Sequence, residues 1–192
     1  MILIVDGDGI DVAAGLQTCP AAKAVYVTPS HQYPLGVTLS MARRLSLIDW
    51  AREAGAYIIE DDYDSEFRFA GPPLSALQGI DGEGRVIYLG TFSKTLLPGF
   101  RIGYLVAPRH LRERMLTIRR LTDRFPSTLA EDALTEFLRD GHFSAHIKRA
   151  RKRVKAARDA LGEVELFEAG TLDAVLALLD AQPQVDLVLL DL

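Results

Sequence analysis

Cysteine is almost absent from this sequence: Cys19 is the only one in 192 residues, so the chain cannot form an internal disulfide. Such usage is typical of proteins from the reducing cytoplasm. The run Met1–Val5 is apolar, but it is interrupted by Asp6 and has no basic flank, unlike a signal peptide. No stretch reaches the roughly 18 to 20 apolar residues of a membrane span. We therefore expect a cytoplasmic protein without a membrane partner.

The chain also lacks an excess of positive charge. Its 22 lysines and arginines are outnumbered by 26 acidic residues, so the overall balance gives no reason to expect a nucleic-acid partner. One basic cluster stands out between Lys148 and Arg158. It could attract phosphate nonspecifically, although a basic face on a long helix is usually only solvated. DNA binding through this cluster stays as an alternative.

Short apolar runs that alternate with helical spacings predict an α/β fold. We expect strands at 2–5, 25–28, 57–60, 86–89 and 102–106, and helices at 38–54, 111–124, 127–139 and about 142–161. The 38–54 helix carries Leu39, Ala42, Leu45 and Ile48 on its apolar face and should end at Gly55. This alternation favours a mainly parallel sheet flanked by helices.

The tail, residues 162–192, differs in composition. It contains seven acidic residues and no lysine or arginine, directly after the basic cluster. Its pattern predicts a strand at 164–167, a helix at 171–181 and a strand at 185–190. We therefore place a boundary after residue 161.

Lys94 follows the strand predicted at 86–89, at the sheet edge where ligands of open α/β sheets collect. A lysine amine can form a Schiff base with the aldehyde of pyridoxal 5'-phosphate (PLP). The hydroxyls of Thr91 and Ser93 and the guanidinium of Arg101 are groups that can hold a phosphate. The alternative, for a lysine taken alone, is an ordinary surface position.

A second set of polar groups follows the neighbouring strands. Asp61 ends the strand at 57–60, where a carboxylate can pair with a protonated pyridine nitrogen. Tyr63 can point its hydroxyl at the phenolic oxygen of the cofactor. His31 lies after the strand at 25–28, in a loop whose polar and aromatic groups could line a cofactor. Taken one by one, these residues could equally form a solvated acidic turn and a surface histidine.

Three segments, 27–40, 58–68 and 90–104, closely resemble the aminotransferase-like domain of MocR/PdxR-type regulators. These are GntR-family bacterial transcription factors whose effector domain looks like a fold type I, PLP-dependent aminotransferase. The resemblance covers about residues 5–161 and implies part of the large domain of that fold. It makes Lys94 the Schiff-base lysine, Asp61 the partner of the pyridine nitrogen and Tyr63 the contact of the phenolic oxygen. Arg101 becomes a phosphate ligand, and Thr91 and Ser93 weaker ones.

The resemblance also implies segments that we do not find in the sequence: a DNA-binding winged helix-turn-helix domain, the first part of the large domain with its glycine-rich phosphate turn, and the small domain. Tyr33 stands where many aminotransferases have an asparagine. We therefore expect an effector-domain fragment that senses an amino-acid-like or vitamer ligand and forms a homodimer. DNA binding would need the helix-turn-helix domain. A degenerate class I/II aminotransferase is the alternative.

The two ends, 1–6 and 162–192, resemble parts of a response-regulator receiver domain. The resemblance makes Asp191 the phosphoacceptor and Asp6 a magnesium ligand. Ordinary α/β packing is the alternative interpretation. If the receiver interpretation holds, the strands at 2–5 and 185–190 should pair in parallel, and the chain would be a composite or a truncated signalling module.

Overall fold

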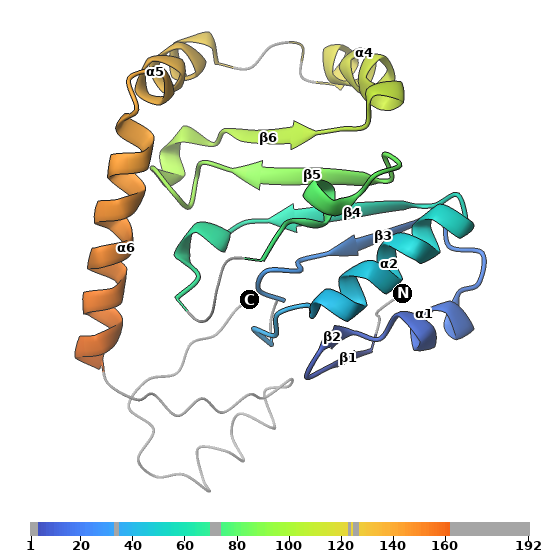
Figure 1. Ribbon diagram of the computed structural model, residues 1–192. Helices are drawn as coiled ribbons and strands as arrows, with labels where there is room; N and C mark the ends of the chain where they lie inside the picture. Colours follow the sequence, from blue (N-terminus) through green and yellow to red (C-terminus); the bar gives the residue numbers. More distant parts are fainter. Residues whose placement is uncertain (1–3, 33–34, 70–73, 123, 125–126, 162–192) are drawn as a thin grey trace, which may run out of the picture. The chain divides into compact units, whose positions relative to one another are not determined.

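The computed structural model describes residues 4–32, 35–69, 74–122, 124 and 127–161 (Figure 1). The chain divides into two compact units, Met1–Lys155 and Ala156–Leu192. The two strands and the helix predicted for the tail lie outside the described residues. None of the helices in the described part is both long enough and apolar enough to cross a bilayer.

A four-stranded sheet forms the centre of the first unit (Figure 1). Its strands are β3 (Ala24–Val27), β4 (Tyr57–Asp62), β5 (Val86–Thr91) and β6 (Gly103–Val106), in the order β3-β4-β5-β6. The pairs β3–β4 and β4–β5 are parallel, whereas β6 runs antiparallel to β5. The prediction of an α/β fold with a mainly parallel sheet is confirmed. β6 reverses because a short connection joins it to β5, and parallel strands need a longer crossover.

The predicted helices are confirmed, with ends that move by a few residues. They are α2 (Met41–Glu53), α4 (Arg112–Thr122), α5 (Thr128–Arg139) and α6 (His142–Leu161). Two short helices, α1 (Val12–Thr18) and α3 (Leu77–Ile80), were not predicted because neither is long enough to show a periodic apolar stripe. Short 3₁₀ turns lie at Ser65–Phe67, Pro98–Phe100 and Arg109–Leu111.

The boundaries of α2 follow local sequence signals, but its buried face does not follow the predicted stripe. Ser40 caps the helix by accepting a hydrogen bond from the Arg43 backbone NH, and Gly55 follows its end with φ +60°. Ala42 and Leu45 are exposed, so the predicted stripe is wrong at those two positions. Residues spaced strictly by three drift around a helix of 3.6 residues per turn. The buried face instead comprises Arg44, Leu47, Trp50 and Ala51.

A small hairpin begins at the end of the strand predicted at 2–5, of which residues 2 and 3 lie outside the described residues. β1 (Val5–Asp6) pairs antiparallel with β2 (Gly9–Ile10), and Ile4 is 64% exposed. A side chain at Gly9 would be strained, because φ is +99° and a Cβ atom would lie 2.6 Å from Leu39 Cδ1. Parallel pairing of residues 2–5 with 185–190 stays untested, because the second strand lies outside the described residues. The Asp6 carboxylate, predicted to bind magnesium, forms an ion pair with Arg43 at 2.8 Å.

The hydrophobic core lies between α2 and the sheet. Val27, Ile58 and Val86 come from β3, β4 and β5, and Leu47 and Ala51 from α2; all are almost completely buried. Side chains alternate between the two faces of a strand. β4 therefore buries Ile58, Glu60 and Asp62 on one face and turns Asp61 to the other.

Candidate functional site

Asp61 lies near the carboxyl end of β4, and a tyrosine from the adjacent strand contacts it. Tyr26 pairs with Ile59 in the parallel β3–β4 register, so Tyr26 and Asp61 share one face of the sheet. The Tyr26 hydroxyl donates a hydrogen bond to Asp61 Oδ2. Partial burial and the neighbouring carboxylate raise the pKa of Tyr26 to about 12, so the phenol stays protonated at neutral pH. The sequence motifs did not point to Tyr26.

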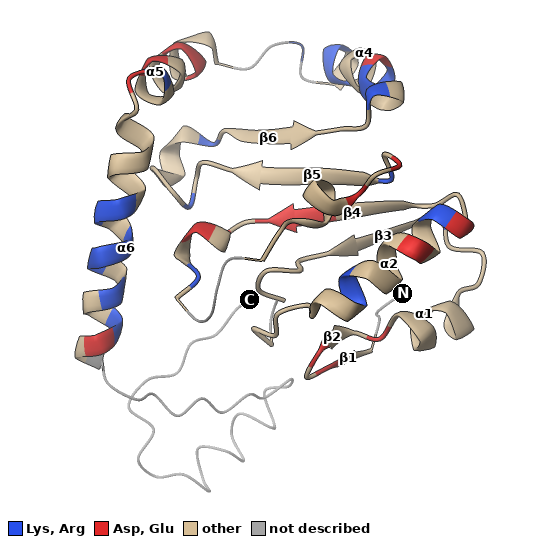
Figure 2. Cartoon of the chain, viewed as in Figure 1, with Lys and Arg blue, Asp and Glu red and all other residues tan. Residues whose placement is uncertain are grey.

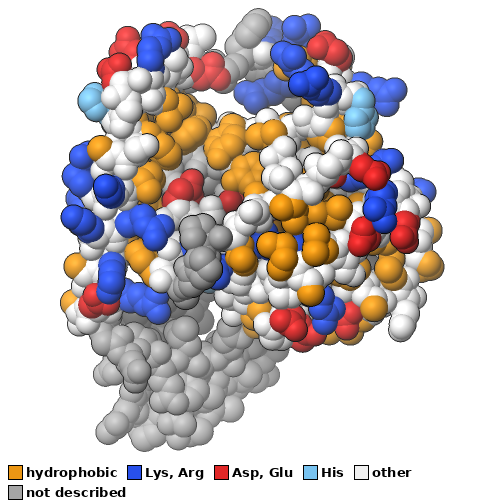
Figure 3. All heavy atoms as spheres, viewed as in Figure 1, with side chains coloured by type: hydrophobic (Ala, Val, Ile, Leu, Met, Phe, Trp, Pro, Cys, Tyr) orange, Lys and Arg blue, Asp and Glu red, His pale blue; other side chains and the backbone are white. Residues whose placement is uncertain are grey.

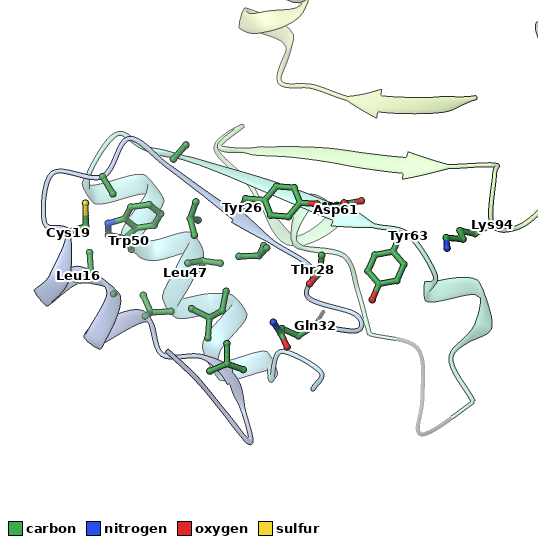
Figure 4. Close-up of a pocket in the computed structure, with 18 residues that line it drawn as sticks. Leu16, Cys19, Tyr26, Thr28, Gln32, Leu47, Trp50, Asp61, Tyr63 and Lys94 are labelled. Carbon is green, nitrogen blue, oxygen red and sulfur yellow. Dashed lines mark hydrogen bonds between the residues drawn. The ribbon is translucent and has the colours of Figure 1, made fainter. Parts of the chain in front are cut away.

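A cavity of about 820 Å³ passes along β3 to this carboxylate, within the volume range of small-molecule sites. Figure 4 shows its polar end, and the labelled side chains there are Tyr26, Thr28, Gln32, Asp61, Tyr63 and Lys94. The other end is apolar, with Leu16, Leu47 and Trp50 among its lining residues. Three of the predicted site residues, Lys94, Asp61 and Tyr63, thus line one cavity.

Tyr63 and His31 connect the loop after β3 to the end of β4. The Tyr63 hydroxyl donates to the His31 backbone carbonyl at 2.8 Å, and the two rings are stacked. His31 Nδ1 lies 2.6 Å from Asp64 Oδ2. His31 was predicted to contact the cofactor, but it is not among the residues that line the cavity. Its observed contacts hold the loop in place, while the predicted cofactor contact remains untested.

Lys94 lies on the short connection between β5 and β6, and its side chain is exposed. Thr91 Oγ1 accepts a hydrogen bond from the Ser93 backbone NH at 3.1 Å, which tightens the turn before the lysine. Arg101, on the same connection, has φ +49°, a left-handed conformation that is uncommon for residues other than glycine. Thr91, Ser93 and Arg101 do not line the cavity. Their predicted role, phosphate binding, stays a prediction.

A buried arginine, which the sequence patterns did not predict, holds the loop after β3 in place. Arg44 is 0% exposed. It donates hydrogen bonds to the carbonyl oxygens of Leu39, Ser75 and Pro29 at 3.0, 3.0 and 2.8 Å. Pro29 begins the loop that carries His31 and Gln32, so Arg44 helps to fix the position of one cavity wall.

Glu60 is the acidic partner of this buried network. Its carboxylate accepts hydrogen bonds from the backbone NH groups of Leu77 and Gln78 at 2.8 and 2.9 Å, and Oε1 lies 4.0 Å from Arg44 Nη1. Burial raises the pKa of Glu60 and lowers that of Arg44, while their mutual attraction opposes both shifts. The network joins α2, β4 and α3.

Asp62, beside Asp61 in sequence, makes hydrogen bonds that stabilise the fold. Its Oδ2 accepts hydrogen bonds from Ser65 Oγ at 2.7 Å and Tyr88 Oη at 2.8 Å. Burial and the Asp62 carboxylate raise the pKa of Tyr88 well above its usual value. These bonds fix the turn after β4, which carries Tyr63.

Comparison with known proteins identifies the family. The family model described as aminotransferase class I and II matches residues 8–171. The chain belongs to this family. It is 45% identical over 136 residues to the probable rhizopine catabolism regulatory protein MocR of Rhizobium meliloti, an alignment that covers 71% of this chain and 28% of that protein. It is 37% identical over 145 residues to the HTH-type pyridoxine biosynthesis transcriptional regulator PdxR of Corynebacterium glutamicum, covering 73% and 32%.

Solved structures agree with this assignment. The crystal structure of Pyrococcus horikoshii kynurenine aminotransferase in complex with PMP superposes with a TM-score of 0.78 at 34% identity, covering 83% of this chain and 41% of that one. The predicted resemblance to a fold type I aminotransferase domain is confirmed. The chain spans about a third of the length of the two curated relatives.

The residues at the polar end of the cavity fit the ring end of pyridoxal phosphate. An exposed amine, a phenol and a carboxylate, from Lys94, Tyr63 and Asp61, line the same space. These groups can react with an aldehyde, bind a phenolic oxygen and pair with a ring nitrogen. Arg101 and the hydroxyls near Lys94 are the candidates for the phosphate end.

Proposed function

We propose that this chain binds pyridoxal 5'-phosphate covalently through Lys94 and is part of an effector domain that senses an amino-acid-like or vitamer ligand. One observation carries the proposal: Asp61 and Tyr63, at the end of β4, and Lys94, after β5, line a single cavity. Family membership and the PMP in the Pyrococcus structure support this choice of cofactor.

Each side chain has a distinct task in this proposal. Lys94 would hold the cofactor covalently, through a Schiff base between its amine and the cofactor aldehyde. Asp61, whose Oδ2 accepts a hydrogen bond from Tyr26, would pair through its carboxylate with the protonated ring nitrogen. The Tyr63 hydroxyl donates to His31 O, and a phenol oxygen can both donate and accept hydrogen bonds. When bound, the cofactor supplies an electron sink for carbanion chemistry.

Sensing is favoured over turnover because the matched relatives MocR and PdxR are described as regulators. In this proposal DNA is bound by a helix-turn-helix domain outside this chain, and the protein acts in the cytoplasm. The alternative is a degenerate aminotransferase, which the likeness to the Pyrococcus enzyme favours.

The basic helix α6 gives a weaker case for DNA binding. Figure 2 shows lysine and arginine residues along it. Arg151, however, donates hydrogen bonds to the carbonyl oxygens of Glu66 and Arg68 and lies over the Phe69 ring. At least one cation of the cluster therefore has a structural contact in the fold.

We also propose that the protein is a homodimer. Tyr104, Leu105 and Val106 of β6, the outermost described strand next to β5, are each at least 40% exposed. Figure 3 shows hydrophobic side chains gathered over this part of the sheet. Sedimentation analysis of the purified chain would reveal a dimer, and a monomer at all concentrations would contradict the proposal.

An absorbance titration with PLP tests the main proposal. We expect a band near the visible range that Lys94→Ala abolishes and that Lys23→Ala, a change at another exposed lysine, leaves intact. A band that persists in Lys94→Ala, or none in the wild type, would refute covalent binding at this site. An added amino acid should change the spectrum without yielding its keto acid; formation of the keto acid would favour the aminotransferase alternative.

A further inference from the structure

We propose that Tyr26 is a positioning residue that orients the Asp61 carboxylate toward the cofactor ring. This inference rests on the proposed function, because it assigns a task to Asp61 in binding PLP. Tyr26 acts through Asp61, and its hydroxyl is not expected to touch the reacting atoms.

The geometry comes from two adjacent parallel strands. Tyr26 lies opposite Ile59, two residues before Asp61, so both side chains project from the same face of the sheet. The Tyr26 hydroxyl donates to Asp61 Oδ2, and both residues line the cavity. Because one oxygen is occupied, the carboxylate has fewer orientations, and Oδ1 is the oxygen available to a ligand.

The neighbouring carboxylate shows why this assignment belongs to Asp61. Asp62 also receives a hydrogen bond from a tyrosine of an adjacent strand, Tyr88 on β5, but on the opposite face of the sheet. Asp62 is 9% exposed and accepts further hydrogen bonds from the Ser65 backbone NH and hydroxyl. It does not line the cavity. The same kind of contact is thus structural at Asp62, whereas at Asp61 it faces the space where a ligand fits.

The Tyr26 hydroxyl can donate its hydrogen bond throughout the experiment. Its raised pKa, about 12, keeps the hydroxyl protonated over the whole pH range in which PLP binding would be measured. Tyr26 is also 57% exposed, so removing its hydroxyl should not disturb the core. The variant Tyr26→Phe therefore tests orientation of the carboxylate and leaves the packing of the fold intact.

The experiment measures PLP affinity and the pH midpoint of the absorbance change of the bound cofactor. Tyr26→Phe should weaken binding about 2- to 10-fold, the effect of one lost hydrogen bond. Without the Tyr26 hydrogen bond, Asp61 should stabilise the positive charge of the ring nitrogen less well. The bound cofactor then releases its second ionisable proton, the one that the absorbance change follows, only at a higher pH. The midpoint should therefore rise by about half a unit to one unit. Tyr57→Phe is the matched control, because its hydroxyl contacts His110 at the other end of β4.

A double variant separates positioning from a general structural role. If Tyr26 acts through Asp61, Tyr26→Phe should change neither affinity nor midpoint in an Asp61→Asn background, which removes the carboxylate. Equal shifts in both backgrounds, or a wild-type midpoint in Tyr26→Phe, would overturn the inference while PLP binding itself stands. Failure of the wild type to show a Lys94-dependent band would overturn the proposed function and this inference together.

Discussion

Replacement of Arg44 by methionine should be among the most destabilising single changes in this protein. The guanidinium is fully buried and donates to three backbone carbonyl groups, those of Leu39, Ser75 and Pro29. Methionine fills a similar space but leaves these acceptors unpaired and Glu60 without a nearby positive charge. Breaking a buried charged pair by removing one partner costs about 3–5 kcal/mol. At about 2–4 °C per kcal/mol for a chain of this size, the melting temperature should fall by roughly 10 °C.

Urea unfolding and thermal melting, both followed by circular dichroism, measure this effect. Arg43→Met is the matched control on the same helix, because Arg43 is partly exposed and pairs with Asp6 and Asp11 near the surface. Such pairs contribute about 1 kcal/mol or less. The double variant Arg44→Met/Glu60→Gln should recover part of the loss, because it removes the unpaired buried charge. A melting temperature for Arg44→Met within about 2 °C of the control would refute the reasoning.

Two further changes test the packing and the electrostatics around the site. Gly90→Ala should destabilise the fold by about 1–3 kcal/mol in urea unfolding, because the new Cβ would lie 2.3 Å from Tyr104 Cζ. Gly79→Ala is the control, because nothing lies within 4 Å of a Cβ at that position. Equal stability of the two variants would contradict this packing. Burial raises the pKa of Glu66 above its usual 4.5, so the folded state binds this proton more tightly and stability falls as the pH rises just above that value. Glu66→Gln should therefore show a smaller fall in melting temperature there than the wild type, and parallel pH profiles would argue against it.

The short motifs of the sequence were enough to predict the family, and they also singled out three residues that the structure places around one cavity. Lys94, Asp61 and Tyr63 each follow an apolar strand, and the carboxyl ends of parallel strands meet at one edge of a sheet. Their meeting in one cavity therefore follows from strand order, which alternating strands and helices already suggest. The helix boundaries were also predictable where a local signal exists, as with Ser40 and Gly55 at the two ends of α2.

Other features needed the tertiary structure. The burial of Arg44 depends on which face of α2 meets the sheet, and a charged residue inside an apolar pattern gives no sign of carbonyl partners that lie up to 31 residues away. The contact between Tyr26 and Asp61 depends on the register of two strands, since a shift by one residue would send Tyr26 to the other face. The antiparallel pairing of β6 with β5 was likewise seen only in the tertiary structure.

By itself, then, the sequence predicted the family, most of the longer strands and helices, and Lys94 as a candidate site residue, because these depend on local patterns and short motifs. Only the tertiary structure shows that Tyr26 contacts Asp61 and that Arg44 and Glu60 form a buried network. Asp61 and Asp62 are neighbours with the same side chain. Because side chains alternate between the two faces of β4, Asp62 is buried within the fold and Asp61 lines the cavity.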